Sequence, residues 1–144
     1  MVDQVRMGRC LCGGVRYRVT GRLRPVVNCH CGQCRHTHGH VAAYTSATKT
    51  ALDLLEDTGL RWYGSSPGTR RGFCGTCGAS VFWERVEGPD ISIAAGTLDG
   101  PTGLATAGHI FVADAGDYYA IMDDLPRFAS SDEGALDSNV TEAD

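Results

Sequence analysis

The seven cysteines of this 144-residue chain fall into three short groups, and this grouping constrains the fold most. Three of them lie within residues 29–35, which read Cys-His-Cys-Gly-Gln-Cys-Arg. The other four form two close pairs, Cys10 with Cys12 and Cys74 with Cys77. Thiols this close together can surround one divalent cation, and zinc is expected because it accepts sulfur and undergoes no redox change.

The two pairs predict one structural site with four thiolate ligands. Residues 74–78 have the form of a zinc knuckle, in which two intervening residues allow both sulfurs to reach the same ion. A metal shared with Cys10 and Cys12 would tie the first strand to the middle of the chain and close a long loop. A thioredoxin-like redox pair at Cys74 and Cys77 is the alternative, but no strand–helix–strand pattern surrounds it.

The group of three thiols, Cys29, Cys31 and Cys34, predicts a second metal site of a different kind. Three thiolates leave one corner of a zinc tetrahedron for water or an incoming thiol, which the metal would deprotonate. Buried apolar cysteines are one alternative, but the intervening residues are polar or small. An iron–sulfur cluster is another, although ferredoxin sequences space their thiols differently.

Several charged and titratable side chains follow this group. Arg35 could offset the negative charge of the thiolates, hold a substrate carboxylate, or be a plain surface charge. If residues 36–40 are extended, the three histidines at positions 36, 38 and 40 point to one face and could move a proton, as could His30. Most histidines are ordinary surface or core groups, so an ordinary structural role is the alternative for each of these four. The predicted catalytic residues are Cys31, Arg35, His30 and His36.

Hydrophobic periodicity predicts a mainly antiparallel β fold with little helix. The alternation in Val15–Val19 indicates a half-buried strand. Nineteen glycines break up helical patterns, and the only helix expected is a short one at Asp117–Met122, ended before Pro126. Further strands are expected at Val41–Ser46, Leu60–Tyr63, Ser80–Trp83, Ile91–Ala95 and His109–Val112.

Composition limits the partners and the location of the protein. Residues 130–144 hold five acidic and no basic residues, which leaves 13 basic against 12 acidic residues in the rest. This near-neutral body argues against nucleic-acid binding. Without an apolar run of membrane-spanning length or an export signal, a reducing cytoplasm is expected. We expect one domain at 1–128 and an acidic, disordered tail at 129–144.

The motifs over residues 8–128 resemble the glutathione-dependent formaldehyde-activating enzyme family, which includes centromere protein V-like proteins. The resemblance rests on three cysteine groups in this order and on two later stretches. These are residues 10–15, residues 29–35 with Gly39, residues 71–78 with Phe82, residues 96–99, and residues 109–112 continuing to 124–126.

The resemblance implies an Mss4-like, β-tent fold with two zinc ions per chain. The structural ion falls on Cys10, Cys12, Cys74 and Cys77, and the catalytic ion falls on Cys29, Cys31 and Cys34. The implied activity joins glutathione to formaldehyde to give S-hydroxymethylglutathione, which is carbon–sulfur lyase chemistry in reverse.

We therefore expect an enzyme that condenses a small thiol with a small aldehyde. Its partners would be these small molecules rather than nucleic acid or membrane, and the chain would be a monomer or homodimer. A zinc-stapled binding module that uses both sites structurally is the alternative, and a redox thiol protein is a third.

Overall fold

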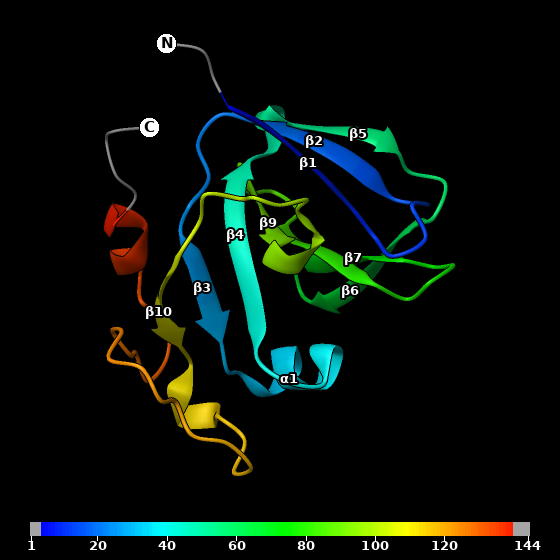
Figure 1. Ribbon diagram of the computed structural model, residues 1–144. Coiled ribbons are helices and arrows are strands. Elements are labelled where there is room, and N and C mark those ends of the chain that lie inside the picture. The colour runs from blue at the N-terminus through cyan, green and yellow to red at the C-terminus, as the bar shows by residue number, and fades with distance from the viewer. Residues whose placement is uncertain (1–3, 140–144) are drawn as a thin grey trace. The chain divides into compact units, whose positions relative to one another are not determined.

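The computed structural model describes residues 4–139 and confirms the mainly β class (Figure 1). The strands form a three-stranded sheet and a seven-stranded sheet. The chain forms two compact units, and the described part of the first comprises residues 4–23 and 45–103. The described part of the second comprises residues 24–44 and 104–139. No helix within residues 4–139 is long and apolar enough to span a membrane.

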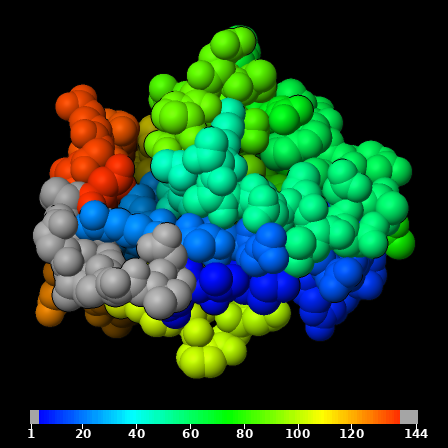
Figure 2. All heavy atoms as spheres, turned by 90° about the horizontal axis from the view of Figure 1, so that it is seen from above, coloured from blue at the N-terminus to red at the C-terminus, as the bar shows by residue number. Residues whose placement is uncertain are grey.

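The three-stranded sheet of the first unit has the order β1-β2-β5. Its antiparallel strands are β1 (Val5–Arg9), β2 (Arg16–Thr20) and β5 (Leu52–Glu56). Figure 2 shows the blue surface of β1 and β2 beside the blue-green surface of β5. Tyr17 and Val19 of β2 are buried while their neighbours Arg16 and Arg18 are exposed, as the predicted alternation requires. Opposite Tyr17 lies Gly8, where a Cβ atom would collide with the tyrosine ring.

The first unit also contains four neighbouring antiparallel strands of the larger sheet, in the order β9-β8-β7-β6. They are β6 (Leu60–Ser66), β7 (Thr69–Cys74), β8 (Ser80–Arg85) and β9 (Asp90–Ala94). Phe82 of β8 and Ile93 of β9 are paired and almost fully buried, and the Phe82 ring contacts Tyr17 edge-on. Short 3-10 turns lie at Lys49–Ala51 and Ala95–Thr97.

The second unit is built around strand β3 (Val26–Cys29). One neighbour is β4 (Ala42–Thr48), which pairs with it antiparallel and whose last residues belong to the first unit. The other is β10 (Thr106–Ile110), which runs parallel to β3 (Figure 1). This parallel pair is an exception within the mainly antiparallel arrangement that the sequence predicts. Helix α1 (Gly32–His38) follows β3, and 3-10 turns lie at Val112–Asp114 and Ala135–Asn139.

One condition considered for the secondary structure is not met, and one local prediction is wrong. The extended conformation considered for residues 36–40 is not found, because residues 32–38 form α1. This short helix is set by its caps rather than by hydrophobic periodicity: the Cys31 thiol accepts from the N–H of Cys34, and Gly39 ends the helix in the left-handed region. The helix predicted at Asp117–Met122 is replaced by a turn and irregular backbone. There, side-chain hydrogen bonds to distant histidines decide the path of the chain.

Much of the acidic segment packs into the second unit. Leu136 is 1% exposed and lies against Gly108 of β10, where an added Cβ atom would come within 2.9 Å of a leucine methyl carbon. Main-chain bonds join Phe111 to Ser130 and His109 to Phe128. The boundary at residue 128 stays a prediction, and the last part of the predicted tail, residues 140–144, lies outside the described residues.

We expect Leu136→Ala to lower the free energy of unfolding by roughly 2–5 kcal/mol, because it removes a buried side chain and leaves a cavity beside β10. Met122→Ala is the matched control, since Met122 is 89% exposed and its truncation should change little. Chemical denaturation of both variants measures the difference. Equal stabilities would contradict the packing of this segment.

Candidate metal centres and an adjoining polar network

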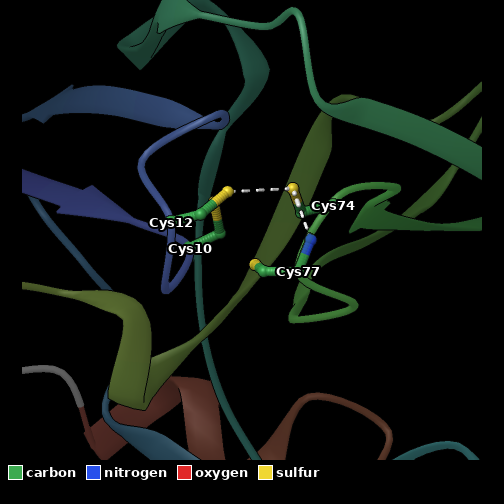
Figure 3. A group of neighbouring side chains, drawn as sticks. All are labelled: Cys10, Cys12, Cys74 and Cys77. Atoms are coloured by element: carbon green, nitrogen blue, oxygen red, sulfur yellow. Dashed lines mark hydrogen bonds between the residues drawn. The ribbon is translucent and has the colours of Figure 1, made fainter.

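The first cysteine cluster lies wholly within the first unit (Figure 3). Cys10 and Cys12 belong to the turn after β1, Cys74 ends β7, and Cys77 lies in the turn before β8. The four sulfurs lie within 4.8 Å of one another, and the Sγ of Cys12 is 3.8 Å from that of Cys10 and 3.7 Å from that of Cys74. The cluster could therefore hold one metal ion. After Cys77 the chain enters β8 directly, which is not the context of a thioredoxin-like pair.

Backbone N–H groups point at the sulfurs of this cluster. The Val15 N–H points at the Cys10 sulfur at 3.2 Å, and the Gly14 N–H points at the Cys12 sulfur at 3.4 Å. The N–H of Ala79 and then that of Cys12 lower the pKa of Cys77 to about 6. Several thiolates in so small a space repel one another unless a cation lies among them, so this donor set fits zinc.

Three glycines bring the two turns of the cluster together. The Gly59 N–H donates to the Gly14 carbonyl at 2.9 Å, and the Gly75 N–H donates to the Gly59 carbonyl at 2.7 Å. A Cβ atom on Gly59 would lie 2.8 Å from the Cys74 sulfur. Any larger residue there would push that sulfur out of place, so this close approach requires glycine.

The second cysteine cluster lies wholly within the second unit. Cys29 ends β3, Cys31 caps α1, and Cys34 is buried on that helix. The three sulfurs lie within 4.8 Å of one another and could hold a metal ion. A hydrogen bond with Cys34 and burial raise the pKa of Cys29. Among residues 4–139, no fourth cysteine, histidine or carboxylate joins this group.

A line of four hydrogen-bonded side chains in the same unit passes through His30, the residue between Cys29 and Cys31. The Tyr119 hydroxyl is 2.6 Å from His30 Nδ1, and His30 Nε2 is 2.9 Å from Nδ1 of His109. Nε2 of His109 is 3.0 Å from both carboxylate oxygens of Asp123. We call these four residues the polar network.

The parallel pairing of β3 and β10 positions the two histidines of the polar network. His109 is opposite Asn28, and the His30 N–H donates to the Ile110 carbonyl at 3.0 Å. Both imidazoles are only 3% exposed, so each ring nitrogen needs a partner, and each has one. The network is therefore a satisfied buried system rather than a collection of surface groups.

The electrostatics of the polar network favour an ionised carboxylate at Asp123 and a neutral imidazole at His30. The N–H of Leu125, followed by His109, holds the pKa of Asp123 below its usual value. Burial, with His109 and His40 nearby, lowers the pKa of His30. Burial also raises the pKa of Tyr119, so this phenol keeps its proton at neutral pH.

Arg35 is a half-buried cation in the second unit with no opposite charge bound to it. Within residues 4–139 it forms no ion pair, and its buried Nε has no hydrogen-bond partner. The side chain of Arg35 lies near Gly116, and its positive charge acts on the Tyr119 phenol. An unpaired guanidinium in this position is suited to an anionic ligand.

The structure separates the histidines that the sequence grouped together. His36 is exposed and its Nδ1–H donates to the Gly32 carbonyl of its own helix at 2.8 Å. His38 contacts the Tyr44 hydroxyl at 3.1 Å, and His40 contacts the Tyr118 hydroxyl at 2.7 Å. A catalytic role for His36 stays a prediction without a contact that favours it, whereas His30 lies inside the polar network.

Sequence reasoning missed three members of the polar network: His109, Tyr119 and Asp123. They follow His30 by 79 to 93 positions, and no short motif links them. The only local signal was His109 itself, a histidine immediately before the apolar run of residues 110–112. A buried polar residue at the edge of such a run needs a partner, but its identity cannot be deduced from spacing.

Comparison with known proteins gives a family and a fold. Residues 5–114 match the family model described as glutathione-dependent formaldehyde-activating enzyme. The chain is also similar to the crystal structure of a Rhodobacter sphaeroides protein, with a TM-score of 0.55 and 24% identity. That likeness covers 69% of this chain and 97% of the other, and at this identity it shows the fold alone. The comparison with curated proteins gives no match.

We expect protein prepared with zinc to bind about two ions per chain, and Cys74→Ser and Cys31→Ser each to bind about one. Cys74→Ser should also lower the melting temperature more, because its cluster joins two turns with 61 residues between Cys12 and Cys74. Elemental analysis and thermal denaturation check both points. Full zinc content in either variant would contradict the assignment of that thiol as a ligand.

Proposed function

Because this chain belongs to the glutathione-dependent formaldehyde-activating enzyme family, we propose that it is a zinc-dependent enzyme of the carbon–sulfur lyase type. The family match confirms the resemblance noted in the sequence. The proposed reaction condenses a thiol, glutathione or a similar one, with a small aldehyde such as formaldehyde. A carbon–sulfur bond forms, and the carbonyl oxygen becomes a hydroxyl that carries the proton lost by the thiol.

The observation that carries this proposal is the difference between the two cysteine clusters. Four thiols can enclose a metal ion completely, whereas the group of Cys29, Cys31 and Cys34 offers three. A zinc ion held there would supply Lewis acidity, which lowers the pKa of a thiol and polarises a carbonyl group. The four-thiol cluster would hold the structural ion.

Arg35 would position the thiol substrate. Glutathione carries two carboxylates, and a guanidinium can bind one of them through two parallel hydrogen bonds. The absence of an ion pair to Arg35 within residues 4–139 supports this role, because no protein carboxylate has to be displaced. A thiol anchored through its carboxylate approaches the reacting centre in a restricted orientation, which lowers the entropic cost of the reaction.

The remaining expectations accompany this proposal. A cytoplasmic location suits thiol ligands that must stay reduced, and all seven cysteines are free thiols. Small molecules are the proposed partners, rather than nucleic acid or a membrane. The assembly would be a monomer or a homodimer.

Zinc-loaded protein should consume formaldehyde only when a thiol is present, and Cys31→Ser should abolish this turnover. The variant should keep its fold and the ion of the four-thiol cluster, because the two clusters lie in different units. Disappearance of free aldehyde, followed by NMR, measures the reaction. Two bound zinc ions without turnover would refute the enzyme and favour the zinc-stapled binding module.

Arg35→Met should raise the KM for glutathione roughly 10-fold to 100-fold, which corresponds to the loss of a charge-assisted hydrogen bond. The KM for cysteamine, a thiol without a carboxylate, should change little. Arg85→Met is the control, because Arg85 is an exposed arginine at the end of β8 in the other unit. Equal effects on both thiols would show that Arg35 does not bind the carboxylate.

A further inference from the structure

The polar network has its least exposed members in the middle and accessible groups at both ends. His30 and His109 are buried, Tyr119 is half-buried, and the side chain of Asp123 is 45% exposed. His30 is flanked in the chain by two thiols of the second cluster. Tyr119 lies close enough to Arg35 and Cys29 for their charges to act on it, so the network connects the neighbourhood of that cluster, at its Tyr119 end, to a carboxylate at the protein surface.

The direction of every hydrogen bond in the network is fixed when Asp123 is ionised and each imidazole carries one proton, which is the resting state of the relay proposed below. Ionised Asp123 can only accept, so Nε2 of His109 donates to it. With that single proton on Nε2, His109 has a lone pair at Nδ1, which accepts from Nε2–H of His30. Nδ1 of His30 is left as an acceptor, so the Tyr119 hydroxyl donates to it. The Tyr119 oxygen therefore keeps lone-pair capacity at the outer end.

We propose that Tyr119 exchanges the proton of the thiol–aldehyde reaction, and that His30, His109 and Asp123 form the relay that stores this proton. The proposal rests on the proposed function and assigns to Tyr119 the proton transfer that the sequence placed on a nearby histidine. Tyr119 would be a catalytic residue. The other three act through it.

Over one turnover the relay takes up one proton and releases one proton. As the thiol S–H bond breaks, its proton binds the Tyr119 oxygen, and the phenol's own proton passes to His30 Nδ1. The Nε2 proton of His30 passes to His109 Nδ1, so His30 stays neutral. His109 then carries two protons and a positive charge, which the Asp123 carboxylate at 3.0 Å stabilises.

The second half of the turnover runs these steps backwards. The sulfur electron pair forms the carbon–sulfur bond, and the electrons of the carbonyl π bond move onto oxygen. Tyr119 gives its proton to that oxygen and takes one back from His30, which in turn takes one from His109. One S–H bond is exchanged for one O–H bond, and nothing is oxidised or reduced.

A neighbouring tyrosine provides a matched control for Tyr119. The Tyr118 hydroxyl also binds a histidine, His40 Nδ1, at 2.7 Å. Both members of this pair are exposed, and among residues 4–139 His40 has no further hydrogen bond that would extend the pair into a chain. A phenol–histidine contact is thus present at both positions, but only that of Tyr119 leads to a buried imidazole and a carboxylate.

The test compares kinetics of zinc-loaded wild type, Tyr119→Phe and Tyr118→Phe. We expect Tyr119→Phe to lower kcat on the order of 100-fold, with unchanged zinc content and little change in the KM for the thiol. Tyr118→Phe should stay within about twofold of wild type. Asp123→Asn should lower kcat on the order of 10-fold, Asp124→Asn should not, and Asp123→Glu should recover part of the loss.

Nitrogen-15 NMR of the imidazoles gives a readout independent of turnover. In wild type at neutral pH, His109 and His30 should both carry their proton on Nε2, and Asp123→Asn should mix the tautomers. A different tautomer in wild type overturns the relay. If zinc-loaded wild type is active and Tyr119→Phe is equally active, the relay is also overturned, but the proposed function stands. Zinc-loaded wild type without turnover overturns the proposed function, and the relay falls with it.

Discussion

The crowding of cysteine sulfurs into two small clusters is the constraint on which this structure depends. In the first unit, four sulfurs within 4.8 Å of one another lie at the junction of two turns far apart in the chain. Backbone N–H groups and close-packed glycines hold them there at the cost of bringing negative charge together. A divalent cation held among the four sulfurs would offset that cost, and its binding would then be coupled to the folding of this unit.

The second unit uses the same donor chemistry with one thiol fewer and different surroundings. Its three sulfurs come from the end of a strand, a helix cap and the first turn of a seven-residue helix. The same unit holds Arg35, which has no ion pair within the described residues 4–139, and a hydrogen-bonded line of polar groups with two buried histidines in its middle. Burying an imidazole costs free energy unless both of its ring nitrogens form hydrogen bonds. Here the two histidines bond to each other, and Tyr119 and the surface carboxylate of Asp123 bond the two remaining nitrogens. Three thiols that could hold a metal ion, an arginine and a hydrogen-bonded line of polar groups thus occur within one unit.

The outcome of the secondary-structure predictions has a common physical cause. The strand at Arg16–Thr20 was visible in the sequence because its alternating burial leaves a local pattern, and Ser80–Trp83 of β8 was visible as a short run rich in apolar and aromatic residues. Helix α1 was missed because a thiol cap and a terminal glycine define seven residues too short to show a period. The helix expected at Asp117–Met122 is absent because Tyr118 and Tyr119 bond to residues 78 and 89 positions away.

The sequence by itself determined the three cysteine groups, the β class and the family, because thiols that could share one ion recur at short, characteristic spacings and half-buried strands leave a local alternation. Only the tertiary structure decided what surrounds the second cluster. Parallel pairing of β3 with β10 brings His109 to His30, and the irregular segment after β10 brings Tyr119 and Asp123 to the two ends of that pair. Such hydrogen bonds join residues of high sequence separation, so no local pattern in the chain records them.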